Sequence, residues 1–217
     1  MAKKTLKKGI FITFEGPEGC GKSTHSKLAA NLLKKEGYDV VYTREPGGTR
    51  LGDRIRETLL NLKKIDIPPL VEMLLFEASR AALVKKVIKP ALLKKKIVIS
   101  DRFNDATHVY QGYAGNIPLK DIYKVETACL GGIKPDLTII LDIDAKTGLN
   151  KTRRSKRDRM ESKKLSFHKK VRKGYLGIAR RDKKRVKVVR TKKTKHETFE
   201  KVKHEVLNVI RRYKRTG

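Results

Sequence analysis

A glycine-rich segment that contains one lysine, residues 16–23 (GPEGCGKS), is where residue types and spacing indicate chemistry most clearly. It matches the pattern G-x-x-x-x-G-K-S/T, in which the glycines let main-chain N–H groups turn inward around phosphate oxygens. In such a phosphate-binding loop, we expect Lys22 to reach the β- and γ-phosphates of a nucleoside triphosphate. The hydroxyl of Ser23 is expected to bind Mg²⁺.

The elements on either side of this loop fit what the motif requires. Residues 9–15 (GIFITFE) are apolar and rich in β-branched and aromatic side chains, which predicts a buried strand. Residues 22–37 carry apolar side chains at helical spacing and end at Gly37, which predicts a helix. The amino terminus of that helix would then face the bound phosphate, where its partial positive charge is favourable.

Short apolar runs alternate with helical patterns along the rest of the chain. Further strands are predicted over 39–43, 97–100 and 137–141, with a weaker one over 186–189. Helices are predicted over 69–93, ended or kinked near Pro90, and from about 196 to 213. This alternation is typical of a parallel sheet covered on both faces. We therefore predict an α/β fold with a five-stranded parallel sheet flanked by helices, in a single domain of residues 1–217.

The composition excludes several classes of protein. Cys20 and Cys129 are the two cysteines of the 217 residues, too few for a disulfide framework, and they indicate a reducing compartment. No apolar run approaches the roughly 20 residues that span a bilayer, and no signal peptide is recognisable. A cytoplasmic protein is therefore expected, and secreted, disulfide-rich and membrane-spanning classes are excluded.

The charge is extreme, with 54 Lys and Arg against 23 Asp and Glu, a net charge of +31. Such a balance could serve nucleic-acid binding, or it could reflect lysines spread over solvated faces, as runs at 34–35, 63–64 and 94–96 indicate. Residues 151–195 are the most basic stretch, and their acidic residues are Asp158, Glu161 and Asp182. A segment this charged can bury little, so its first half is predicted to be mobile unless an anion orders it.

The loop motif alone does not identify the molecule that receives or hydrolyses phosphate. A GTPase would carry an N-K-x-D type motif, and residues 150–153 (NKTR) lack the aspartate. Motor ATPases usually need a longer chain. A kinase of a small phosphorylated metabolite needs a second anion site and a basic lid, and the chain offers candidates for both.

Several further segments resemble those of the thymidylate kinase family of nucleoside monophosphate kinases, in the same order over about residues 9–190. They are 43–49 (TREPGGT), 75–80 (LFEASR), 100–103 (SDRF), 110–112 (YQG), 134–138 (KPDLT) and 158–161 (DRME). The resemblance implies the nucleoside monophosphate kinase fold, with ATP and dTMP as substrates, dTDP as product, Mg²⁺ as cofactor and a homodimeric assembly. It assigns ATP binding to Gly16, Pro17, Glu18, Gly19, Cys20, Gly21, Lys22, Ser23 and Thr24.

The expected catalytic groups are cationic. An acceptor phosphate with a second pKa of about 6 is already mostly a dianion at neutral pH, so the reaction needs positive charge rather than a general base. The resemblance implies that Lys22 and Arg102 act on the phosphates, and that Ser23 and Asp101 hold the metal. The loop carries Gly19 and Cys20 where one family type has arginine, so a lid over about 150–165 should supply it. The candidates are Arg153, which we select, and Arg154, Arg157 and Arg159.

The resemblance also implies how dTMP is recognised. Phe76 would stack on thymine, Thr107 would hydrogen-bond the base, and Tyr110 would crowd out a 2′-hydroxyl. Arg80 is expected on the acceptor phosphate, with the base edge as an alternative, and Glu18 at the 3′-hydroxyl. The full predicted set is Glu18, Arg44, Glu45, Pro46, Phe76, Arg80, Arg102, Thr107, Tyr110 and Gln111.

Two other functions stay open at this point. One is a kinase for another monophosphate, such as dUMP or CMP. The other is a basic protein with a phosphate-binding loop that binds RNA or DNA. Aromatic residues are sparse among the basic ones of 151–195, with Phe167 and Tyr175 only, which weakens the second alternative.

Overall fold

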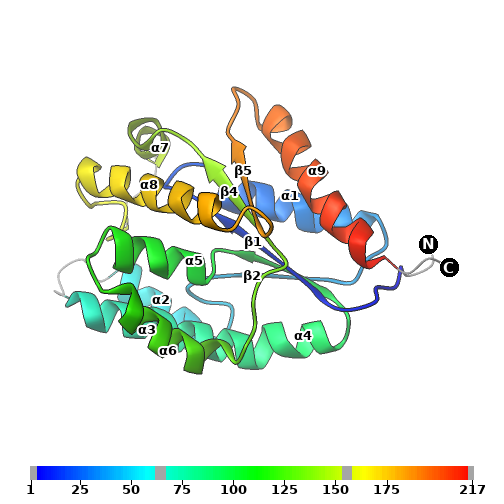
Figure 1. Cartoon of the computed structure of the whole chain (residues 1–217), viewed down its shortest axis with the longest axis horizontal. Helices are drawn as coiled ribbons and strands as arrows, with labels where there is room; N and C mark the ends of the chain where they lie inside the picture. The colour runs from blue at the N-terminus through cyan, green and yellow to red at the C-terminus, as the bar shows by residue number, and fades with distance from the viewer. Residues whose placement is uncertain (1–3, 62–66, 153–157, 215–217) are drawn as a thin grey trace.

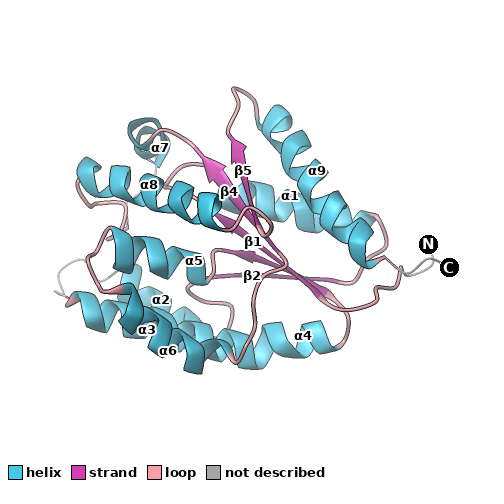
Figure 2. Ribbon diagram, in the orientation of Figure 1, coloured by secondary structure: helices cyan, strands magenta, loops and turns pink. Residues whose placement is uncertain are grey.

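A sheet of five parallel strands forms the centre of the protein (Figure 2). The computed structural model describes residues 4–61, 67–152 and 158–214. The strands lie in the order β2-β3-β1-β4-β5, and every pair of neighbours is parallel. Their bounds are β1 (Ile10–Glu15), β2 (Val40–Arg44), β3 (Ile97–Asp101), β4 (Leu137–Asp142) and β5 (Val186–Arg190). The predicted parallel sheet is confirmed, and each predicted strand lies within one residue of its expected ends.

Helices cover both faces of this sheet (Figure 1). On one side lie α1 (Lys22–Lys35) and α9 (Lys195–Tyr213). The other side carries α2 (Arg50–Asn61), α3 (Pro69–Leu83), α4 (Lys89–Leu93), α5 (Asn104–Thr107), α6 (Leu119–Leu130) and α8 (Leu165–Arg181). The π-helical turns η1 (Val84–Ile88) and η2 (His108–Tyr113) continue α3 and α5, and α7 (Ala145–Thr152) follows β4. No helix of the described ranges has an apolar stretch long enough to cross a membrane.

The two faces of the sheet contribute to separate apolar cores. Side chains alternate across a strand, so Ile12 and Phe14 of β1 pack with Val206 of α9, whereas Phe11 packs with Leu83 of α3 on the other face. All six residues of β1 are buried. The central strand is therefore fixed from both sides, and the loop that leaves its carboxyl end starts from a rigid position.

The helix predicted over 69–93 is present as the continuous series α3, η1 and α4. Pro90 lies in the first turn of α4, where a missing N–H is tolerated best. The π-helical turn at Val84–Ile88 comes just before α4. The departure from α-helical geometry expected at Pro90 therefore lies about one turn earlier in the chain.

The expectation that the basic stretch 151–195 buries little is wrong for α8. This helix places His168, Val171, Tyr175 and Ala179 on one buried face at helical spacing, while its lysines and arginines lie mainly on the opposite face. The hydroxyl of Tyr175 donates a hydrogen bond of 2.8 Å to Glu15 at the end of β1. A narrow stripe of apolar and aromatic residues was therefore enough to order this helix.

Helix α5 and the η2 turn that continues it are tied to the edge of the sheet by an ion pair. Arg185, next to β5, donates to both carboxylate oxygens of Asp105 in α5, at 2.7 and 3.1 Å. The same guanidinium donates to the hydroxyl of Thr138 at 2.7 Å and to Asp182 at 2.8 Å. The Asp105 side chain is only 3% exposed, and Arg185 is the cation paired with it.

Replacing Arg185 by methionine (Arg185→Met) should lower the free energy of unfolding by about 2 kcal/mol or more, because Asp105 would remain buried and uncompensated. Chemical denaturation followed by circular dichroism measures this. Asp182→Asn is the matched control, since that carboxylate is 43% exposed and its loss should cost about 0.5 kcal/mol. Equal effects of the two variants would contradict the role given to Asp105.

Candidate functional site

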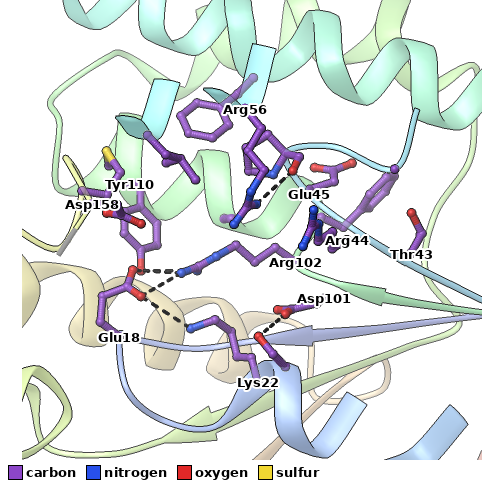
Figure 3. Close-up of a pocket in the computed structure, with 18 of the residues that line it drawn as sticks. Glu18, Lys22, Thr43, Arg44, Glu45, Arg56, Asp101, Arg102, Tyr110 and Asp158 are labelled. Atoms are coloured by element: carbon purple, nitrogen blue, oxygen red, sulfur yellow. Dashed lines mark hydrogen bonds and ion pairs between the residues drawn. The ribbon is translucent and has the colours of Figure 1, made fainter. Parts of the chain in front are cut away.

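A cavity of about 840 Å³ opens at the carboxyl ends of β1, β2 and β3 (Figure 3). This is the edge of a parallel sheet where ligands generally bind. Most of the residues predicted from the sequence line it: Glu18, Gly19, Gly21, Lys22, Ser23, Thr24, Arg44, Glu45, Pro46, Phe76, Arg80, Asp101, Arg102, Thr107, Tyr110 and Gln111. Gly16, Pro17 and Cys20 belong to the same loop but do not line the cavity, and Cys20 is buried.

The phosphate-binding loop has the backbone that its glycines predict. Gly19 has a φ of 67°, and a Cβ there would lie 2.0 Å from the carbonyl oxygen of Gly148. Helix α1 begins at Lys22, so its first N–H groups face the loop. The ammonium group of Lys22 donates to the carbonyl oxygens of Gly16 and Pro17, both at 2.9 Å. The lysine is thus folded over the loop, with its charge at the floor of the cavity.

Glu18 joins three functional side chains (Figure 3). Its carboxylate accepts hydrogen bonds from Nη2 of Arg102 at 2.8 and 3.0 Å and from the hydroxyl of Tyr110 at 2.6 Å. The Nζ atom of Lys22 lies 4.0 Å away. Burial alone would raise the pKa of Glu18, but the charges of Arg102 and Lys22 and the Tyr110 hydrogen bond lower it to about 2. Glu18 is therefore ionised at any physiological pH.

Arg102 follows β3 in a left-handed backbone conformation, with a φ of 72°. Its N–H donates to the carbonyl of Phe14 at 2.9 Å, and its own carbonyl accepts from Ser100 Oγ at 2.7 Å. A conformation that costs energy for an arginine persists only where the surroundings impose it, and such positions cluster at functional sites. Burial opposes its charge, but Glu18 keeps the pKa of Arg102 well above its usual range.

Ser23 and Asp101 meet beside the first turn of α1. The hydroxyl of Ser23 donates a hydrogen bond to Oδ2 of Asp101. Both supply hard oxygen ligands at the edge of the cavity. Mg²⁺ is characteristically bound by one or two protein oxygens together with water and substrate phosphates. The donor set therefore fits the predicted metal.

Arg80 is held by the protein on all sides, and its residue is 1% exposed. Its Nε donates to Glu45 at 2.8 Å, and its Nη1 donates to Glu77 and, at 3.0 Å, to Thr107. Its Nη2 donates to the carbonyl of Phe103 at 3.2 Å and lies 2.7 Å from Glu45. Each nitrogen is thus engaged, and the predicted contact of Arg80 with the acceptor phosphate or the base edge would require exchange of one of these partners.

Arg56 is a cavity residue that the sequence analysis missed. It points from α2 into the cavity and donates to the carbonyl of Pro46 at 3.0 Å (Figure 3). Burial and the nearby charges of Arg44 and Arg102 lower the pKa of Arg56. Three guanidinium groups therefore face one part of the cavity, an arrangement that suits an anionic ligand. The sequence analysis gave no helix over 50–61, although Arg56 stands at helical spacing from Gly52, Leu59 and Leu60, the buried residues of α2. Other lining residues that were missed include Lys27, Tyr42, Thr43, Asp158, Met160 and Glu161.

Of the four predicted lid arginines, one lies within the described residues. Arg153, Arg154 and Arg157 lie outside the described residues. Arg159 is described, and its guanidinium forms an ion pair with Glu72 and donates from Nε to the carbonyl of Leu59 at 2.9 Å. Its side chain is thus bound to α2 and α3, which does not favour Arg159 as the arginine that acts on phosphate.

Comparison with known proteins agrees with this geometry. The family model described as thymidylate kinase matches residues 14–202. The chain belongs to the thymidylate kinase family. A thymidylate kinase from Caldanaerobacter subterraneus is 47% identical over 80% of this chain and 83% of its own length. One from Dehalococcoides mccartyi is 45% identical over 91% of this chain and 95% of its own.

A crystal structure of a family member has the same architecture. Thymidylate kinase from Ehrlichia chaffeensis superposes with a TM-score of 0.75 at 35% identity, covering 93% of this chain and 98% of the other. The family resemblance expected from the motifs is therefore confirmed.

Glu15, at the end of β1, is a buried carboxylate next to the thymidylate kinase site. Its carboxylate accepts from the N–H of Phe103 at 2.7 Å and from Tyr175 at 2.8 Å. Burial and the nearby charge of Asp105 raise the pKa of Glu15 to about 8. The folded protein thus holds a proton here that the unfolded chain releases at about pH 4.3.

Stability should therefore fall as pH rises from about 5 to 8, because the folded state binds the extra proton and loses it only near pH 8. The contribution of one such group is at most about 1.4 kcal/mol per pH unit. Denaturation of the wild type and of Glu15→Gln across this range measures it, and the difference between the two slopes isolates Glu15. Parallel pH profiles would show that Glu15 has an ordinary pKa.

Proposed function

We propose that this protein transfers the γ-phosphate of ATP to dTMP, giving dTDP and ADP. The observation that carries this proposal is a single cavity with two anion sites. One is the phosphate-binding loop with Lys22, and the other is the cluster of Arg44, Arg56 and Arg102. Two nucleotides bound there would face each other through their phosphates. Membership of the thymidylate kinase family supports dTMP as the acceptor.

In this proposal the protein catalyses the transfer by positioning the two phosphates and by placing positive charge around them. The loop amides and Lys22 hold the β- and γ-phosphates, while Arg44 and Arg56 hold the acceptor phosphate. Arg102 has a fixed backbone and a guanidinium anchored by Glu18, so it can act on both phosphates and stabilise charge on the transferring group. We propose Arg153 as the arginine that the lid supplies to the phosphates.

Ser23 and Asp101 are the residues that would hold Mg²⁺, Asp101 through the water shell of the ion. When bound, the ion would neutralise charge on the phosphate oxygens. The hydrogen bond between the two side chains places their oxygens side by side at the edge of the cavity.

Recognition of the nucleoside is assigned to residues of the cavity wall that come from several elements. Phe76 would stack on thymine, and Thr107 and Gln111 would face its polar edge. Glu18 would accept a hydrogen bond from the 3′-hydroxyl, and Tyr110, whose own hydroxyl is tied to Glu18, would leave no room for a 2′-hydroxyl. The remaining wall residues in this proposal are Arg44, Glu45, Pro46 and Arg80.

A coupled ADP-release assay over a panel of nucleoside monophosphates tests the proposed reaction. The wild type should turn over dTMP fastest, and Arg102→Ala should lose at least about 100-fold in kcat, because it removes a preorganised charge from the transferring phosphate. Circular dichroism should show that this variant is folded.

Arg54→Ala is the matched control, since this arginine of the same charge lies on the outer face of α2 with its side chain 76% exposed, and its activity should equal that of the wild type. Faster turnover of dUMP or CMP than of dTMP would support a different monophosphate kinase. A near-normal rate in Arg102→Ala would overturn the role given to Arg102.

We further propose that the chain forms a homodimer through α3. This helix exposes Leu70 at 55%, Val71 at 44% and Leu74 at 43%, although its opposite side is buried in the protein. Apolar side chains grouped in this way on one helix are typical of an interaction surface. The homodimer implied by the family resemblance would cover them.

Light scattering during size-exclusion chromatography tests the assembly. The wild type should elute as a dimer, and Leu74→Glu should shift it towards the monomer, because a charge would be buried at the contact. Leu93→Glu is the control, since Leu93 is 75% exposed at the end of α4, away from α3's exposed face. A monomeric wild type, or equal behaviour of the two variants, would contradict this interface.

A further inference from the structure

Glu72 on α3 is a buried carboxylate that connects two parts of the cavity wall. Its Oε1 accepts a hydrogen bond of 2.8 Å from Nε2 of Gln111 in η2. Its Oε2 forms an ion pair with Nη2 of Arg159. The Glu72 side chain is 5% exposed. One carboxylate therefore fixes a residue that lines the cavity and is itself fixed by an arginine from a distant part of the sequence.

Arg159 is in turn anchored to the end of α2. Its Nε donates to the carbonyl of Leu59 at 2.9 Å, and its main-chain N–H donates to the carbonyl of Leu60 at 3.2 Å. These bonds fix the guanidinium against Glu72, so Oε2 of the carboxylate is engaged with a cation. A carboxylate paired with a guanidinium can only accept hydrogen bonds.

The amide of Gln111 must then turn its NH₂ group towards Glu72. Its Oε1 is left on the other side, and no donor among the described residues is bonded to it. Gln111 lines the cavity together with Phe76 and Thr107, the residues assigned to the base. The atom that the amide offers to a ligand is consequently an acceptor.

We infer that Glu72 and Arg159 are positioning residues that set the base specificity of the site by fixing the orientation of the Gln111 amide. The inference rests on the proposed function. Thymine carries an N–H at N3, which an acceptor oxygen can bind, whereas cytosine has a lone pair at N3 and would be repelled. An amide free to rotate would offer either its oxygen or its NH₂ group and would lose this discrimination.

The ratio of kcat/KM for dTMP to that for dCMP tests the inference, with dUMP as an internal reference. Uracil has the same N3–H as thymine, so the ratio of dTMP to dUMP should not change in any variant. Glu72→Gln can donate as well as accept, and it should lower the dTMP-to-dCMP ratio by about tenfold. A merely structural role would slow all three substrates alike and leave both ratios unchanged.

Two further comparisons test whether Glu72 acts on base specificity through the Gln111 amide. In a Gln111→Leu background, Glu72→Gln should cause no additional change in the dTMP-to-dCMP ratio, since the group that it orients is absent. Arg159→Met should lower the ratio in the wild-type background by at least about threefold, and Arg159→Lys, which retains the positive charge, should lower it less.

An unchanged dTMP-to-dCMP ratio in folded Glu72→Gln would overturn the inference, as would a further drop in the Gln111→Leu background. If Glu72→Gln does not fold, the ratio in Arg159→Met decides the question. A wild-type enzyme that does not phosphorylate dTMP would overturn the proposed function instead, so the two failures are distinguishable.

Discussion

Strong positive charge has to be held in a small volume without the groups repelling one another, and this constraint governs the arrangement of the site. Arg44, Arg56 and Arg102 face one cavity, and burial together with the nearby charges of Arg44 and Arg102 lowers the pKa of Arg56. Acidic side chains provide the compensation. Glu18 binds Arg102 directly, and its ionised state is secured by the same arginine. The cavity is thus prepared for anions before any substrate arrives.

The helical segment formed by α5 and η2 positions the residues assigned to the nucleoside. Thr107, Tyr110 and Gln111 all lie on it. It is bound at Asp105 to the edge of the sheet and at Gln111 to α3. Residues that contact a small substrate need positions fixed to a fraction of an ångström. Attachment to two separate elements provides such precision without a long helix.

The sequence predicted the sheet and the phosphate-binding loop well, because both depend on local patterns. Continuous apolar runs identified the strands, and the loop has a fixed spacing of glycine, lysine and serine. Arg56 belongs to no recognised motif, and its inward direction follows from the helical spacing and packing of α2. The ion pairs of Arg80 and Arg159 join residues distant in sequence or on different elements, and only the folded chain shows them. Family resemblance located Arg80 in the site but could not reveal that its nitrogens are already engaged.

The position of β5 at the edge of the sheet gives the unusual charge of this protein a physical role outside the cavity. An edge strand offers unpaired N–H and C=O groups to any neighbouring chain, and exposed apolar residues such as Val188 would favour such pairing. Lys187 and Arg190 lie on the same short strand. Two copies brought edge to edge would place these cations against each other, within molecules that already repel through a net charge of +31. The charge on β5 and on the whole chain thereby opposes pairing of two copies through this edge of the sheet.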